Sequence, residues 1–141
     1  MTDFLLTFDW VGLWGAHART FLWAVIAFTL PVFALPLFFA PMQWAKRFGW
    51  PLPADTAGYN LALYFGRCVG AFVLIVEALM LRAAWNGTAL VFTFQVLLGV
   101  AALMVWVHVL GAWQRRQPLS ETLEIGMYGG MGLLALLFHP R

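Results

Sequence analysis

The sequence predicts an all-α integral membrane protein, folded as an antiparallel four-helix transmembrane bundle. Hydrophobic residues make up 63% of the 141 residues and charged residues only 10%, whereas soluble domains average roughly 45–50% and about 25%. The apolar residues gather in four runs, each long enough to cross a hydrocarbon core about 30 Å thick as a helix. A soluble chain of this size could not bury so much apolar surface, so lipid is the expected solvent.

The first expected span covers residues 21–40. It contains Pro31 and Pro36, which predict a kink or a partly unwound turn in its second half. The other expected spans cover residues 59–81, 88–113 and 121–138. Residues 1–18 are expected either to lie as a short interfacial helix or to form an ordered or fraying lead-in to the first span. Together these segments predict a single transmembrane domain over residues 1–141.

The connections between the spans predict the topology. Residues 43–58 form the long loop, whereas the links at residues 82–87 and 114–120 are short and require antiparallel neighbours. The basic residues on the side of the long loop are Lys46, Arg47, Arg115 and Arg116, and those on the other side are Arg19, Arg82 and Arg141. The positive-inside rule then predicts that both termini lie outside, which for a protein of the bacterial inner membrane, the expected location, means the periplasm.

Four Arg, His or Glu residues lie in the interior of the expected spans, away from the span ends, where charge is costly and marks a function or an interhelical pair. They are Arg67, Glu77, His108 and Glu124. At about 1.5 Å of rise per residue, counting from the span ends places Arg67, His108 and Glu124 at one depth, in the same leaflet. We therefore expect these three side chains to meet in one polar network.

Two pairs of glycines predict where helices approach each other closely. Gly66 and Gly70 form a small-xxx-small step on the second span, and Gly126 and Gly130 form another on the fourth. Such steps let helix backbones approach each other in lipid. The sequence therefore predicts that the second and fourth spans touch near Arg67.

Two interpretations of the Arg67, His108 and Glu124 network stay open. It forms a small pocket for a quinone headgroup, a lipid headgroup or a proton, with Arg67 as the fixed cation, Glu124 as the acceptor and His108 as the titratable group. Alternatively, Arg67 and Glu124 form an ion pair that fixes helix register, and His108 bonds to a backbone carbonyl.

Glu77 is expected in the opposite leaflet. Its nearest predicted polar partners are Thr93 and Gln95, early in the third span. Glu77 is then either a neutral glutamic acid hydrogen-bonded to Gln95 or a member of a proton relay.

Several functions are disfavoured by composition and motif content. A net charge of +2 without a basic stripe argues against nucleic-acid binding. A haem held by two histidines would need a second histidine at the depth of His108, but His17 and His139 are expected on the other side. A haem or chlorin is therefore disfavoured. No recognised metal-ligand spacing and no nucleophile, Walker or dinucleotide motif occurs in the sequence. We therefore assign neither a metal site nor catalytic residues.

The segment from Leu63 to Ala71, with sequence LYFGRCVGA, resembles the Arg-x-x-Gly opening of a helix in DoxX-like four-helix membrane proteins. The four-span layout and the glycines of the last span fit the same family. The resemblance implies a small inner-membrane protein, linked in some members to quinone reduction or to assembly with redox partners. Arg67 is the one residue to which the resemblance extends.

The predicted function is that of an accessory or structural subunit of a larger membrane redox complex, or of a self-associating bundle surrounded by membrane lipids. Little chain remains outside the spans for soluble catalytic machinery. One alternative is a quinone- or lipid-linked membrane enzyme that uses the intramembrane pocket. The other is a small proton-coupled transporter, with Glu77 and Glu124 carrying protons from opposite leaflets.

Overall fold

The structure, a computed structural model, describes residues 9–140. All regular secondary structure within this range is helical. Three helices are long and apolar enough to cross a membrane: Gly15–Phe39, Thr56–Asn86 and Leu90–Trp113. The chain is thus an all-α protein with three candidate membrane-spanning helices.

The first of these helices changes its winding along its length. It runs through η1 (Gly15–His17), α2 (Ala18–Thr29), η2 (Leu30–Ala34) and α3 (Leu35–Phe39). The distortion predicted near Pro31 takes the form of a π-helical turn, η2. Proline has no N–H for the regular helical bond, so a wider turn there is the expected relief. After Ala40 leaves helical geometry, the short helix α4 (Pro41–Arg47) begins with a proline.

The second long helix, α5 (Thr56–Asn86), extends beyond the predicted span at both ends. Its N-cap is Asp55, whose side chain accepts a hydrogen bond of 2.7 Å from the Gly58 N–H. It ends at Gly87 in the left-handed conformation, with φ of 71°. Caps depend on the residues at the helix ends and not on hydropathy, so an apolar run alone could not mark them. The last two helices are α6 (Leu90–Trp113) and α7 (Leu119–Leu137).

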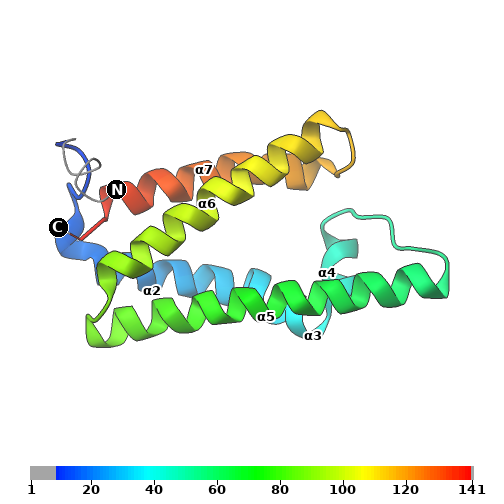
Figure 1. The fold of residues 1–141 in the computed structure, drawn as a ribbon, viewed down its shortest axis with the longest axis horizontal. Helices are drawn as coiled ribbons and strands as arrows, with labels where there is room; N and C mark the ends of the chain where they lie inside the picture. The colour runs from blue at the N-terminus through cyan, green and yellow to red at the C-terminus, as the bar shows by residue number, and fades with distance from the viewer. Residues whose placement is uncertain (1–8, 141) are drawn as a thin grey trace.

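The helices form two pairs (Figure 1). In one pair α2 and α3 pack along α5, and in the other α6 packs along α7. The pairs meet at the end that carries the chain termini and diverge toward the end that carries α4 and the α6–α7 turn. A cluster of buried residues from α2, α5, α6 and α7 forms the hydrophobic core at the terminal end.

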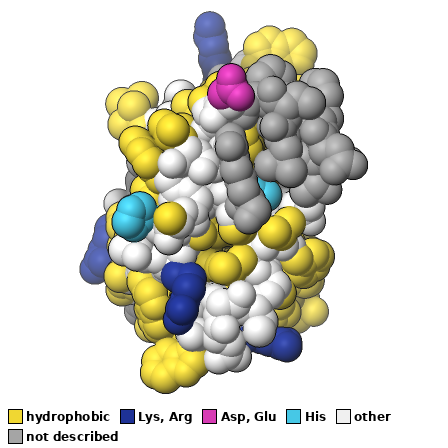
Figure 2. Space-filling model, turned by 90° about the vertical axis from the view of Figure 1, so that its left-hand side faces the viewer, with side chains coloured by type: hydrophobic (Ala, Val, Ile, Leu, Met, Phe, Trp, Pro, Cys, Tyr) yellow, Lys and Arg dark blue, Asp and Glu magenta, His cyan; other side chains and the backbone are white. Residues whose placement is uncertain are grey.

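The terminal end is also fastened by hydrogen bonds to helix C-termini. The backbone N–H groups of Gly12 and Trp14 donate to carbonyls in the last turn of α7, each at 2.8 Å. Arg19 donates to the carbonyls of Ala84 and Trp85 at the end of α5, each at 2.7 Å. These bonds satisfy carbonyls that a helix end leaves free. Figure 2 shows this end, where Lys and Arg side chains lie beside exposed hydrophobic ones.

The segment expected as a lead-in, residues 1–18, lies partly outside the described residues. From residue 9 to residue 14 it forms turns, which are followed by η1. This described part is an ordered lead-in to the first long helix.

The glycine steps do not join the helices that the sequence predicted. A Cβ on Gly66 would lie 2.5 Å from the Pro41 Cβ, and one on Gly70 would overlap the backbone of Phe38. Gly126 and Gly130 have no neighbouring atoms within 4 Å of where a Cβ would stand. The predicted contact of the second and fourth spans at these steps is therefore wrong. The glycines of α5 instead admit the backbone of α3 and the start of α4.

His139, just after α7, is buried at the terminal end and is 2% exposed. Its ring packs edge-on against Phe94, with centroids 5.9 Å apart, and neither ring nitrogen has a hydrogen-bond partner among the described residues. Burial disfavours the imidazolium and lowers the pKa of His139. The unfolded chain, with an ordinary histidine pKa near 6.5, therefore takes up protons at a higher pH than the folded chain.

We expect the free energy of unfolding to fall as the pH drops below about 6.5, because the unfolded state then binds more protons than the folded state. His139→Phe should remove this contribution and flatten the dependence. Unfolding in detergent, followed by circular dichroism at pH 7.5 and 5.5, measures the difference. His17→Phe, at an exposed histidine, is the control. An unchanged pH dependence in His139→Phe would contradict the expectation.

Candidate functional site

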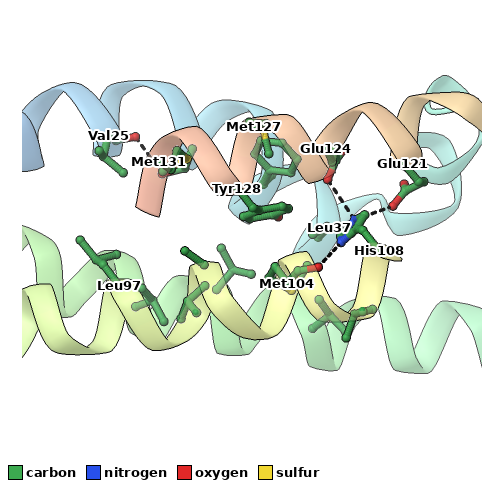
Figure 3. A pocket seen from close by; sticks show the side chains of 18 of the residues that line it. Val25, Leu37, Leu97, Met104, His108, Glu121, Glu124, Met127, Tyr128 and Met131 are labelled. Atoms are coloured by element: carbon green, nitrogen blue, oxygen red, sulfur yellow. Dashed lines mark hydrogen bonds and ion pairs between the residues drawn. The ribbon is translucent and has the colours of Figure 1, made fainter. Parts of the chain in front are cut away.

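Three ionisable side chains meet where the helix pairs diverge (Figure 3). The Nε2 atom of His108 lies 3.1 Å from Glu121 Oε2 and 3.4 Å from Glu124 Oε2. All three residues are buried, with side-chain exposures of 4% for His108, 10% for Glu121 and 9% for Glu124. We call these three residues the His-Glu-Glu cluster.

The sequence brings the cluster together through one helical hairpin. His108 lies in the last turns of α6, and a short turn leads directly into α7. Glu121 and Glu124 are three residues apart at the start of α7, so both carboxylates face the same side of that helix. Antiparallel packing of α6 and α7 then sets that side against His108.

Surrounding groups hold the cluster in place. The Nδ1 atom of His108 lies 2.7 Å from the carbonyl oxygen of Met104, one turn earlier in α6. The indole N–H of Trp50, from the loop after α4, donates to Glu121 Oε1 at 2.8 Å. Gln117, in the α6–α7 turn, donates to the backbone carbonyl of His108 at 3.0 Å. The imidazole and one carboxylate are thus each oriented by a second hydrogen bond.

The loop after α4 also touches the start of α7 directly. The hydroxyl of Ser120 donates to the backbone carbonyl of Phe48. With the bond from Trp50, this contact closes the diverging end of the molecule over the cluster.

The cluster lines one end of a partly open cavity of about 560 Å³ between the two helix pairs. Most of the remaining lining is aliphatic or aromatic and comes from every long helix. Figure 3 shows Leu97 and Met131 farther along the cavity, away from His108. The Tyr128 ring lies beside the imidazole, with ring centroids 5.3 Å apart. The cavity is therefore polar at the cluster and mostly apolar along the rest of its length.

Glu77 also lines this cavity, from α5. Its Oε1 atom lies 2.5 Å from the hydroxyl oxygen of Thr29 in α2. Thr93 hydrogen-bonds to the Ala89 carbonyl instead, and Gln95 does not line the cavity. The structure thus pairs Glu77 with α2, the neighbour of α5, and not with the expected partners on the third span.

Arg67 lies outside the network that the sequence predicted. Its side chain is exposed and forms no ion pair within residues 9–140, whereas Gly66 and Val69 line the cavity. A helix turns by roughly 100° per residue, so Arg67 lies level with the cavity but on a face of α5 that points away from it. The expected meeting of His108 with Glu124 is found, and the expected pairing of Arg67 with Glu124 is not.

Two residues of the site are not among the predicted site residues. Glu121 is the first residue of the predicted fourth span, and its spacing of three from Glu124 is a signal that both carboxylates share one face. Trp50 lies in the predicted long loop, and no local pattern indicates that its indole reaches a carboxylate on α7. Only the fold supplies that contact.

Comparison with known proteins adds no assignment: no family model, curated protein or solved structure matches this chain. The resemblance to DoxX-like proteins accordingly stays a prediction. The site has to be interpreted from its own geometry.

Proposed function

We propose that this chain is a four-span membrane protein that binds an amphiphilic molecule, a quinone or a lipid, in the cavity between its two helix pairs. The headgroup would lie at the His-Glu-Glu cluster and the apolar chain would lie along the cavity. The observation that carries the proposal is the buried His-Glu-Glu cluster at one end of a cavity whose remaining lining is mostly apolar.

The fourth crossing in this proposal is α7. Its 19 residues give a length of about 28 Å at 1.5 Å per residue, close to the thickness of a hydrocarbon core. It packs along α6, and its C-terminal end reaches the core at the terminal end. Glu121 and Glu124 lower its overall hydropathy, but both are buried against the rest of the protein, where lipid does not meet them.

The orientation in the membrane follows from the charged ends. The α4 end carries Lys46, Arg47, Arg115 and Arg116. The positive-inside rule places this end in the cytoplasm of a bacterial cell and the termini in the periplasm. His108 lies five residues before the end of α6, or about 8 Å, which is close to the headgroup level of that leaflet.

An amphiphile fits such a cavity for a physical reason. Its chain replaces lipid contacts with contacts to apolar side chains, and its headgroup can hydrogen-bond to groups that have no other partner. Glu124 Oε1 is such a group, because it is buried and has no hydrogen-bond partner among the described residues. From Leu97 to His108 the cavity follows α6 for about 16 Å, which accommodates much of an acyl or isoprenoid chain.

Filling the cavity should displace the bound molecule. Val100 lines the cavity on α6, whereas Leu103, on the same helix, is 67% exposed and does not line it. We expect native mass spectrometry from mild detergent to show wild-type protein and Leu103→Trp with a bound lipid or quinone mass. Val100→Trp should lose that mass while keeping its helical circular dichroism spectrum. Absence of any bound mass in the wild type, or equal retention in Val100→Trp, would overturn the proposal.

A second candidate role, as an accessory subunit of a membrane complex, is favoured by α7. Gly126, Gly129 and Gly130 each have open space where a Cβ would stand. A partner helix could approach α7 closely there. In the same experiment, a subunit that stays bound in Val100→Trp and leaves in Gly129→Leu would support this role. Retention in both variants, or no bound subunit in the wild type, would contradict it.

A further inference from the structure

We propose that His108, Glu121 and Glu124 form a binding site for a divalent transition-metal ion. One ligand atom from each residue lies within 4.8 Å of the other two. The two nearest separations, 3.1 Å and 3.4 Å from His108 Nε2, are those between neighbouring ligands of an ion whose Zn–N and Zn–O distances are about 2.0–2.2 Å. The proposal does not depend on what occupies the rest of the cavity.

The tautomer of His108 leaves a gap that a cation would fill. The Met104 carbonyl can only accept a hydrogen bond, so Nδ1 must be the protonated nitrogen at a separation of 2.7 Å. In the neutral ring, Nε2 then points its lone pair at two carboxylate oxygens. Three acceptors facing one another repel unless a proton or a metal cation lies between them. A metal ion supplies that charge while the imidazole stays neutral.

The neighbours of the cluster are those that metal ligands require. A histidine ligand usually donates its other N–H to a carbonyl or carboxylate, as His108 does to Met104. Ligating carboxylates are themselves hydrogen-bonded, as Glu121 is to Trp50 at 2.8 Å. Glu124, which is nine-tenths buried, keeps Oε1 without a partner among the described residues, so it can bind through either oxygen.

Charge and donor type indicate the class of ion. Two carboxylates and one divalent cation sum to zero, which suits a site of low dielectric constant. Imidazole nitrogen together with carboxylate oxygen favours Zn²⁺, Fe²⁺, Co²⁺ or Mn²⁺ over Mg²⁺ and Ca²⁺, which prefer oxygen alone. Three protein ligands leave a further coordination position for water or another small ligand.

The test uses the full chain in detergent, stripped of metal with a chelator and dialysed. We expect titration calorimetry with Zn²⁺ to show one site per chain, and Co²⁺ to give visible absorption bands. His108→Gln and Glu124→Gln should abolish both signals, whereas His17→Gln, at an exposed histidine, should retain them. Trp50→Phe, which leaves all three ligands in place, should weaken Zn²⁺ binding by roughly 10–100-fold.

Trp50→Phe also keeps the test decisive should the ligand variants fail to fold. The proposal would be overturned by the absence of Zn²⁺ and Co²⁺ binding to the wild type. It would equally be overturned by Zn²⁺ binding of unchanged affinity in Trp50→Phe and in whichever ligand variants fold. The cluster would then hold protons only.

Discussion

His108→Ala is expected to destabilise the metal-free protein by about 3–5 kcal/mol, the usual loss when one partner of a buried ionic group is removed. The substitution deletes the nitrogen that faces both carboxylates at 3.1 Å and 3.4 Å. It leaves Glu121 and Glu124 buried beside each other without the imidazole that faces both of them. The free energy of unfolding is measured by titration with sodium dodecyl sulfate in mixed micelles, with a chelator present, and followed by circular dichroism.

A double-mutant cycle separates this effect from lost packing. His108→Ala combined with Glu124→Gln should be more stable than the sum of the single losses predicts, because the amide removes one of the two stranded charges. His17→Ala, at an exposed histidine, should change the stability by no more than about 0.5 kcal/mol. Additive losses in the cycle, or a loss in His108→Ala no larger than that in His17→Ala, would contradict the interpretation.

The fold could be predicted from the sequence as far as the physics of the hydrocarbon core dictates it. A helix must satisfy its own backbone in lipid, so each run of about 20 apolar residues predicts one helix. The predicted span at residues 88–113 matches α6 closely. Thr56–Asn86 is longer than its prediction because Asp55 and Gly87 set its ends, and hydropathy does not detect caps.

The positions of the site residues along their helices could be predicted from the sequence, but the helix face on which each residue lies could not. The rise per residue is fixed, so counting placed His108 and Glu124 at one level, and they do meet. To predict which face of a helix points inward, one face must differ in polarity from the others, and α6 is similarly apolar on all sides. On α5 the polar residue Arg67 suggested an inward face, yet the cavity is lined by its neighbours Gly66 and Val69. In lipid, polarity alone did not identify the inward face.

Small-residue steps posed a related problem, because they indicate close packing without naming the partner. The π turn in η2 and the break at Ala40 bring Phe38 and Pro41 onto Gly70 and Gly66. No pattern in the α5 sequence specifies that contact. The partner is determined by how the preceding segment bends, which is a property of the assembled fold.

The close contact of Gly70 with the backbone of Phe38 predicts a large loss of stability when a side chain is added at Gly70. Gly70→Ala should lower the free energy of unfolding by about 2 kcal/mol. Its new Cβ would overlap the backbone of Phe38, which cannot move aside as a flexible side chain could. We take the cost of this overlap at the upper end of the usual range, about 3 kcal/mol, against a gain in helix propensity of about 1 kcal/mol. Gly126→Ala is the matched control on α7, where a Cβ meets open space. Both substitutions gain the same intrinsic helix propensity, about 1 kcal/mol.

Since propensity is matched, the difference between the two alanine variants measures the packing of α5 against α3. The same titration with sodium dodecyl sulfate should show Gly126→Ala unfolding at a higher detergent fraction than the wild type and Gly70→Ala at a lower one. Stabilisation by both substitutions would mean that α3 does not lie on α5 at Gly70. The cavity, which both helices line, would then have to be wider at its polar end, and the proposed headgroup site would lose one of its walls.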